Sequence, residues 1–494
     1  MKIIGDSLPR RFKAKASGSI TAGKPLIVKS DGDVTQVSET TLSTITGTES
    51  VFESAQTSYI RTVFDSTANK FVIAYSDGGN SSYGTAVVCT VSSDGTRSYG
   101  TPVVFESAST NWIALTYDSN ADKTLISYNA STSGKSIVGS VSGSAISFGS
   151  AATFQSSSSS EHIDSCFDST NNKVVIVYSK NTDATGRAVV ATISGTSVSF
   201  GSVAQWESTE ISVLSCEHDS TNGKFLIAYC DNDNSFYGTA LVGTVSGTSI
   251  SFGSATVFYS NDMRGVRTDM AFDSNAGKFA VLYAENSAGT DGIVIVATIS
   301  GTSVSFGSAV EFDGGTITRT RGMAICFNSA TNKVNIFYSD NGDNGKGYVK
   351  QGTISGTSVG SLTSRVAFHN IDYCDDMSAD FDTNLNLSLV AYRRGKSSVH
   401  GSTENYGVAN TMRPVAFNVT NLTSENYIGI AEYAAADTET ATVLIKGGVS
   451  TTQSSLTPGQ TYFVQGDGTI GTSADSPSVT AGTAVTSTKL IVKG

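Results

Sequence analysis

The chain has 494 residues, among them 49 glycines but only 6 prolines, with 15% charged residues and a formal net charge of −11. The charge argues against a nucleic-acid partner, because phosphate binding needs clustered lysine and arginine. The composition is typical of many short strands joined by tight turns, not of a helical enzyme.

The start of the chain, residues 1–6, lacks an apolar core and a small-residue cleavage site, so we expect no signal peptide. No run approaches 18 apolar residues, so we expect no membrane insertion. The cysteines show no CxxC spacing, and we expect them to be small apolar fillers in a protein made in a reducing cytoplasm. They are Cys89, Cys166, Cys216, Cys230, Cys326 and Cys374.

One hairpin signature organises the chain: Phe167-Asp168-Ser169-Thr170-Asn171-Asn172-Lys173, followed by the apolar run 174–178. It occurs seven times at intervals of 50 to 55 residues. The residues that open the copies are Phe64, Tyr117, Phe167, His218, Phe272, Phe327 and Phe381. A repeat of this length, built of short apolar runs and polar turns, predicts an all-β fold, a seven-bladed β-propeller. The signature aspartate is expected to accept hydrogen bonds from turn amides, a role that asparagine can also fill in the sixth copy.

Each repeat is predicted to contain four strands, exemplified by residues 269–273, 278–283, 188–193 and 198–201 for the first to the fourth. The seventh repeat has no fourth strand after residues 405–409. Residues 45–53 resemble the fourth strands of other repeats, so we expect them to pair beside the stretch near Tyr406 and remove the open edge.

The two ends of the chain resemble each other. Residues 19–32 match residues 455–468 column by column, each as a glycine turn, a strand and an Asp-Gly turn. We therefore expect a small β-barrel built from both chain termini, residues 1–37 with 414–494, into which the propeller of residues 38–413 is inserted.

The repeats differ mainly in two sets of loops, those between the second and third strands and those before each first strand. Function tends to lie on variable loops over a constant scaffold. We expect a ligand-binding face there, because aromatic rings stack on sugars and arginine can orient an anionic glycan. The candidates are Tyr59, Trp112, Asp231, Asp233, Arg264, Arg267, Arg319, Arg321 and Tyr373.

Catalytic chemistry is not indicated. The Ser-x-Asp-x-Gly-x-Thr-Trp turns of a sialidase-like site are missing, and the four histidines lack metal-ligand spacing. A carboxylate pair for glycoside cleavage stays open at Asp375 and Asp376. We expect no enzyme activity, no metal and no cofactor.

The terminal segments 427–449, 456–464 and 481–485 resemble the small β-barrel of tailed-phage virion proteins. This resemblance implies a structural protein on the virion surface, of the tail-fibre or receptor-binding type. Its barrel would dock to other virion proteins, and its propeller would bind a host surface glycan or protein. A capsid decoration protein and a glycan-degrading propeller enzyme are the alternatives, and a homotrimer is possible.

Overall fold

The structure is a computed structural model that describes residues 10–156, 158–263, 267–285, 291–313, 322–370, 373–395 and 405–493. It divides into two compact units, residues 44–415 and residues 1–43 together with 416–494. Within the described ranges no helix is long and apolar enough to cross a membrane.

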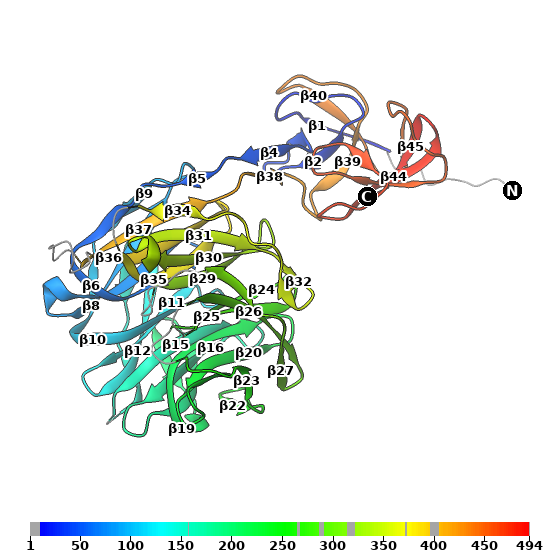
Figure 1. The fold of residues 1–494 in the computed structure, drawn as a ribbon. Coiled ribbons are helices and arrows are strands. Elements are labelled where there is room, and N and C mark those ends of the chain that lie inside the picture. The colour runs from blue at the N-terminus through cyan, green and yellow to red at the C-terminus, as the bar shows by residue number, and fades with distance from the viewer. Residues whose placement is uncertain are drawn as a thin grey trace. The chain divides into compact units, whose positions relative to one another are not determined.

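The unit of residues 44–415 is all-β and propeller-like, made of successive antiparallel meanders (Figure 1). Its first, inner strands end at the signature; they are β6 (Ser50–Asp65), β10 (Val103–Asp118), β15 (Ser160–Asp168), β19 (Ala204–Asp219), β24 (Asp269–Asp273), β29 (Met323–Asn328) and β35 (Tyr373–Asp382). The second strands are β7 (Lys70–Asp77), β11 (Lys123–Ala130), β16 (Lys173–Lys180), β20 (Lys224–Asp231), β25 (Lys278–Ala284), β30 (Lys333–Asp340) and β36 (Leu387–Gly395). The third strands are β8 (Tyr83–Val91), β12 (Ser133–Ser142), β17 (Thr185–Ser194), β21 (Tyr237–Ser246), β26 (Gly292–Ser300), β31 (Lys346–Gly352) and β37 (Asn405–Arg413).

The fourth, outer strands are short and broken. They are β5 (Ile45–Thr46), β9 (Arg97–Tyr99), β13 (Ala145–Phe148), β14 (Ala152–Gln155), β18 (Ser197–Phe200), β22 (Ser249–Phe252), β23 (Thr256–Tyr259), β27 (Ser303–Phe306), β28 (Val310–Asp313) and β34 (Val366–His369), with the start of β6, β10 and β19. A small hairpin, β32 (Ile354–Ser355) with β33 (Ser358–Val359), precedes β34. Two loops after second strands contain the short 3-10 helices η1 (Gly78–Asn80) and η2 (Asn341–Asp343).

A glycine explains the break in the outer strand. The single fourth strand predicted at residues 198–201 is incomplete, because β17 pairs first with β18 and then with the start of β19. A Cβ added to Gly201, at the break, would lie 2.0 Å from the carbonyl oxygen of Thr248 in the next repeat. Only glycine allows this approach. The outer strand is therefore interrupted where it passes the turn between the third and fourth strands of the next repeat.

The signature aspartates hold the turn between the first and second strands, as predicted. Asp168 Oδ1 accepts hydrogen bonds from the amides of Thr170 and Asn171, each at 3.0 Å. Asn328, in the sixth copy, accepts from the amide of Thr331 at 3.1 Å. The same contact recurs at Asp65, Asp118, Asp219, Asp273 and Asp382.

Neighbouring repeats pack through an aromatic pair. In each pair a ring of one outer strand contacts the tyrosine of the next second strand, with centroids 4.8 to 5.4 Å apart. The pairs are Phe52–Tyr75, Phe105–Tyr128, Phe154–Tyr178, Trp206–Tyr229, Phe258–Tyr283, Phe312–Tyr338 and Phe368–Tyr392. Aromatic pairs at this spacing stabilise a structure beyond the burial of their surface area. They therefore help to hold neighbouring repeats together.

The first and last repeats share one sheet, which confirms the predicted closure. Strand β37 pairs with β5 and the start of β6, so that Gly407 faces Glu53 and Met412 faces Thr46 (Figure 1). Glu49 reinforces the joint, because its carboxylate lies 2.9 Å from His369 Nδ1 and accepts from Arg394. A strand from the front of the polypeptide therefore covers the edge that the seventh repeat leaves open.

Both chain connections of this unit lie at the turn end of the inner strands. The register Arg413↔Ile45 pairs the outgoing strand with the incoming one. Arg413 donates to the carbonyl oxygens of Asn386, at 3.0 Å, and Leu385, which belong to the signature turn of the seventh repeat. The loops at the opposite end of the strands thus carry neither connection.

The unit formed by both termini contains two five-stranded sheets and a two-stranded ribbon. The orders are β1 (Arg11–Lys15)-β40 (Thr440–Leu444)-β39 (Tyr427–Ala431)-β2 (Pro25–Val28)-β3 (Val34–Gln36) and β41 (Val449–Ser450)-β45 (Lys489–Val492)-β44 (Val479–Thr486)-β42 (Thr461–Val464)-β43 (Ile470–Gly471), with β38 (Phe417–Thr420)-β4 (Glu39–Leu42) as the ribbon. The predicted closed barrel is not found among the described residues. A single bridge between Ala16 and Val34 joins the edges of the first sheet, too little for a continuous ladder.

The resemblance between the two ends of the chain is structural as well. β2 and β3 form a hairpin after Gly23, and β42 and β43 form the equivalent hairpin after Gly459. The two glycines have φ of 84° and 83°, a left-handed conformation that favours glycine.

Candidate functional site

A backbone irregularity places side chains at the loop end of the inner strands. We number positions from the aromatic that opens the signature, counted as position 0. At position −5 the pairing with the second strand shifts register, and the residue there has positive φ in five repeats. These residues are Tyr59 (55°), Trp112 (52°), His162 (47°), Val213 (46°) and Asp376 (49°). None is glycine, and such conformations in other residues cluster at functional sites.

The five residues contact one another in sequence around the inner strands, and we call them the loop-end belt. Asp376 accepts a hydrogen bond from the amide of Tyr59. The ring of Tyr59 lies 5.4 Å from that of Trp112, which lies 4.3 Å from the ring of His162. His162 Nδ1 accepts from the amide of Val213 at 3.3 Å, so a neutral ring carries its proton on Nε2.

Polar side chains stand one position nearer the loops. Asp375 receives two hydrogen bonds from Arg393, at 2.7 and 2.6 Å. Ser212 donates to Asn232 at 2.7 Å. These polar groups lie beside Asp376 and Val213, the two ends of the belt. The aromatic residues between those ends are half-buried.

Arg267 occupies position −5 in the fifth repeat and behaves differently. It precedes β24 and donates to the carbonyl oxygen of Met377 in β35 at 2.6 Å. Because Met377 follows Asp376, this contact brings Arg267 back to the belt.

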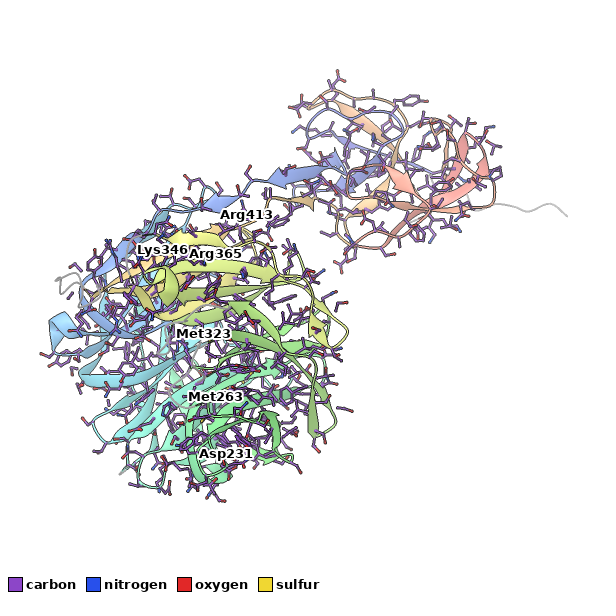
Figure 2. The ribbon with its side chains drawn as sticks, viewed as in Figure 1. Asp231, Met263, Met323, Lys346, Arg365 and Arg413 are labelled. Carbon is purple, nitrogen blue, oxygen red and sulfur yellow. The ribbon has the colours of Figure 1, made fainter. Side chains whose placement is uncertain are left out.

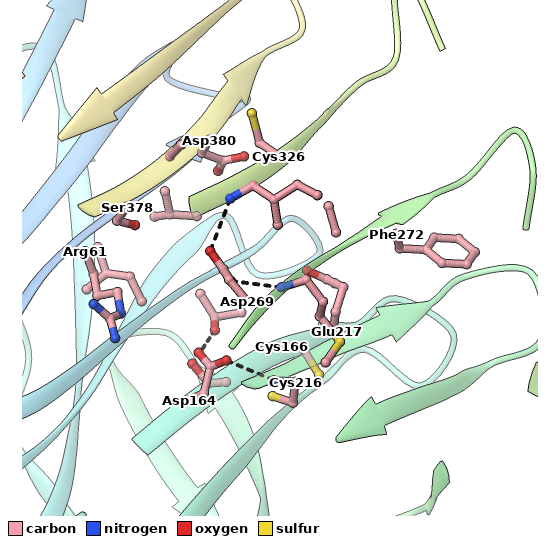
Figure 3. Close-up of a pocket in the computed structure, with 18 of the residues that line it drawn as sticks. Arg61, Asp164, Cys166, Cys216, Glu217, Asp269, Phe272, Cys326, Ser378 and Asp380 are labelled. Carbon is pink, nitrogen blue, oxygen red and sulfur yellow. Dashed lines mark hydrogen bonds between the residues drawn. The ribbon is translucent and has the colours of Figure 1, made fainter. Parts of the chain in front are cut away.

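A cavity of about 490 Å³ runs between the inner strands (Figure 3). All seven described inner strands contribute to its lining, from Arg267 toward the loop end to Ser119 beyond the turn end. Tyr59, Trp112 and His162 are not part of that lining. Since Ser119 is exposed, the cavity reaches solvent at the turn end.

Three aspartates in the cavity cap the free inner edge of a neighbouring strand. Asp164 accepts from the amide of Cys216 at 2.9 Å, and Asp269 accepts from that of Ile325 at 3.2 Å. Asp380 accepts from the amide of Phe64 at 2.7 Å. These bonds satisfy edge amides that have no partner strand.

Burial changes the protonation of these acids. Burial raises the pKa of Asp164 and of Asp380 to about 6, and it raises the pKa of Asp269. The pKa of Glu217 is raised to about 8, chiefly by burial and then by the nearby aspartates. Glu217 is therefore mostly protonated at neutral pH. Among the described residues no group of three acidic, histidine or cysteine side chains could hold a metal.

The structure gathers only some of the predicted site residues. Tyr59, Trp112 and Arg267 share position −5 at the loop end. Asp231 ends β20 and accepts from the amide of Asn234 at 3.2 Å, and Asp233 lies exposed in the loop that follows. Figure 2 shows Asp231 well separated from Lys346 and Arg365.

Tyr373 instead packs on a glycine of a neighbouring loop. A Cβ at Gly345 would lie 2.6 Å from the Tyr373 ring, so this ring has a packing role. Arg264, Arg319 and Arg321 lie outside the described residues.

The sequence-based ligand site omitted His162 and the cavity acids, and Asp376 was considered only as part of a possible carboxylate pair with Asp375. An alignment of the inner strands by position 0 would have signalled them. It places Glu217 and Asp380 in a column where the other repeats have Val, Thr, Cys or Ala, and it places Asp164 in a column that also contains Arg61 and Asp269.

No protein-family model and no curated protein matches the chain. Among solved structures it is similar to AofleA from Arthrobotrys oligospora (8% identity, 73% of this chain and 96% of that chain, TM-score 0.42). It is also similar to a leech intramolecular trans-sialidase (10% identity, 76% and 70%, TM-score 0.44) and to the SapL1 lectin in complex with alpha methyl fucoside (11% identity, 64% and 97%, TM-score 0.38). At these TM-scores the likenesses carry no argument about activity.

Proposed function

We propose that this protein binds carbohydrate through the loop end of its propeller-like unit. The loop-end belt is the observation that carries this proposal. Tyr59, Trp112 and His162 form a contiguous, half-buried aromatic surface in a constrained backbone. Aromatic faces bind the apolar faces of sugar rings, and a few placed polar groups fix orientation.

The polar groups around the belt suit this ligand class. Asp375 is held by Arg393, and Ser212 by Asn232, so their orientation is fixed before a ligand binds. Preorganised groups reduce the entropic cost of binding. We propose a binding protein and not an enzyme, because Asp164, Asp269 and Asp380 are engaged with backbone amides.

The chain offers its own reporter for the test. It has two tryptophans, and Trp206 contacts Tyr229 in the interface between repeats. Replacing Trp206 with Phe leaves Trp112 as the sole tryptophan. Titration with a panel of neutral and acidic oligosaccharides should then change the emission of Trp112 for at least one sugar.

A matched pair of variants completes the experiment. Trp112→Ala removes the reporter, so its binding is measured by calorimetry; it should bind the responding sugar at least tenfold more weakly, about 1.4 kcal/mol. Tyr433→Ala removes an aromatic that is 62% exposed in the terminal unit, and it should leave binding unchanged. Equal binding by all variants, with unchanged melting temperatures, would rule out the belt.

We further propose that the repeats form seven blades of one ring and that the terminal unit is its anchor. The aromatic pairs between repeats and the β37–β6 pairing support the ring. The position of both chain connections at the turn end supports an anchor, because the loop end stays clear of them.

The anchor is proposed to dock on a phage particle, with the loop end facing a host surface glycan. Deletion of residues 44–415 should give particles that assemble but adsorb poorly. Normal adsorption would remove the receptor-binding role. Microscopy that locates the chain on the head would favour capsid decoration.

A further inference from the structure

Two cysteines meet between the inner strands of the third and fourth repeats. Cys166 lies on β15 and Cys216 on β19, and both are buried free thiols that line the cavity (Figure 3). Their side chains are hydrogen-bonded to each other. Cys326, which lines the same cavity, instead lies 3.3 Å from Oγ of Ser388. Cys166 and Cys216 are therefore placed so that one thiol can react with the other.

The register of neighbouring inner strands accounts for this contact. A side chain at position −3 accepts from the amide at position −2 of the next repeat, as Asp164 does from Cys216 at 2.9 Å. The side chain at position −1 then comes opposite the side chain at position −2 of the next repeat. One repeat earlier the same two positions hold Thr116 and Ser165, whose hydroxyl oxygens lie 2.6 Å apart. The backbone therefore directs the sulfur atoms of Cys166 and Cys216 toward each other.

This arrangement suits a disulfide, which forms without backbone movement only where two Cβ atoms are close and directed toward each other. The 2.6 Å approach of the equivalent hydroxyl oxygens shows that neighbouring inner strands come close enough for such a bond. β15 pairs with β16, while β19 pairs with β20 and, at its outer start, with β17, so no described ladder joins the inner parts of β15 and β19. A bond between the two sulfurs would join the third and fourth repeats covalently at this point.

We propose that Cys166 and Cys216 form a reversible disulfide when the folded protein meets a small organic disulfide as oxidant. The thiolate of one cysteine attacks a sulfur atom of the oxidant, and one half of the oxidant leaves as a thiol. The thiolate of the second cysteine displaces the other half, so the protein disulfide forms while the oxidant is reduced to two thiols and takes up the two protons. In a reducing cytoplasm the pair stays reduced, and the cross-link forms in oxidising surroundings. The proposal does not depend on carbohydrate binding.

The cavity gives the oxidant a route, because it reaches solvent at the turn end and both thiols line it. Burial, followed by the neighbouring Cys166 thiol, raises the pKa of Cys216 well above its ordinary value. The carboxyls of Asp164 and Glu217 act on both cysteines, and that of Asp168 also acts on Cys166. Because the thiolate is the attacking species, exchange should be slow at neutral pH and faster at alkaline pH.

Hydroxyethyl disulfide is a suitable probe because it is small and uncharged. The full chain is incubated with it at pH 8.5 and then digested at acid pH without reduction. Mass spectrometry should find the peptides of Cys166 and Cys216 joined, with the loss of two hydrogen atoms, and dithiothreitol should separate them. The cross-link closes a loop of about 50 residues in the unfolded chain, so the oxidised protein should melt roughly 4 °C higher than the reduced protein.

Serine variants identify the pair. Cys166→Ser and Cys216→Ser should each lose both the cross-link and the rise in melting temperature. Cys326→Ser is the matched control and should keep both, because Cys326 also occupies position −1 and lines the cavity but has Ala379 at position −2 of the next repeat. Free thiols at residues 166 and 216 after prolonged incubation, a cross-link that involves Cys326 instead, or a cross-linked chain that melts below the reduced chain would each overturn the proposal.

Discussion

The two ends of the inner strands differ in how much their residues vary between repeats. At the turn end, an aspartate in six repeats and an asparagine in the sixth copy accept the same turn amides. At the loop end, position −5 carries a different residue in each described repeat, and five of these have positive φ. The turn end is therefore a repeated structural device, whereas the loop end shares one backbone conformation in five repeats and varies in side-chain chemistry. This is the pattern expected where a fixed scaffold presents a binding surface.

The largest effect is expected on the pH dependence of stability, because several carboxyls with raised pKa values line the cavity between the inner strands. The folded pKa of Glu217 is about 8, against 4.5 for the free group, and those of Asp164 and Asp380 are about 6, against 3.8. A carboxyl with a raised folded pKa binds more protons when folded, so its contribution to stability is lost as pH rises. Linkage over these three carboxyls should lower the free energy of unfolding by roughly 6 kcal/mol between pH 5 and pH 8, with about half of that fall from Glu217.

Urea denaturation across this pH range measures the effect. Glu217→Gln should flatten most of the slope between pH 6.5 and pH 8, where Asp164 and Asp380 are already mostly ionised and Glu217 loses most of the remaining protons. A slope that survives this substitution would show that Glu217 is not the source of the pH dependence of stability.

The sequence predicts the turn end far better than the loop end. Asp168 and its equivalents occupy a fixed position in the turn signature. Their hydrogen bonds join neighbouring residues and can be predicted from the sequence. The closure by residues 45–53 was also predictable. The seventh repeat lacks a fourth strand, and these residues have the pattern of the fourth strands in the other repeats. The belt was not, since Tyr59, Trp112 and Val213 are not residues that signal positive φ. The cavity depends on which inner strands face one another in the propeller-like unit, and that information is not local.

The second test concerns the turn end itself. Asp273 is buried and accepts from the amides of Asn275 and Ala276, both at 2.9 Å. Asp273→Ala leaves these amides without their acceptor and should lower the free energy of unfolding by about 1–3 kcal/mol. Asp273→Asn keeps an acceptor, as Asn328 does in the sixth copy, and should cost less than half as much. Equal losses in thermal or urea melts would mean that charge, not the acceptor, holds the turn.

The smallest effect is expected at the loop end, at Val213. Its φ of 46° is strained for a β-branched residue, by about 1–3 kcal/mol. Val213→Gly removes the strain but also loses side-chain packing and adds backbone entropy to the unfolded chain, so the net change in the free energy of unfolding should stay within about 1 kcal/mol.

The matched control for Val213 is Val189, a valine that is buried in the regular strand β17. Val189→Gly has no strain to relieve and should cost several times more than Val213→Gly in urea melts, by roughly 3 kcal/mol. Similar losses at both positions would mean that the loop-end backbone is relaxed. The belt would then be held by its ring contacts alone, and its shared backbone would no longer distinguish it from ordinary packing between repeats.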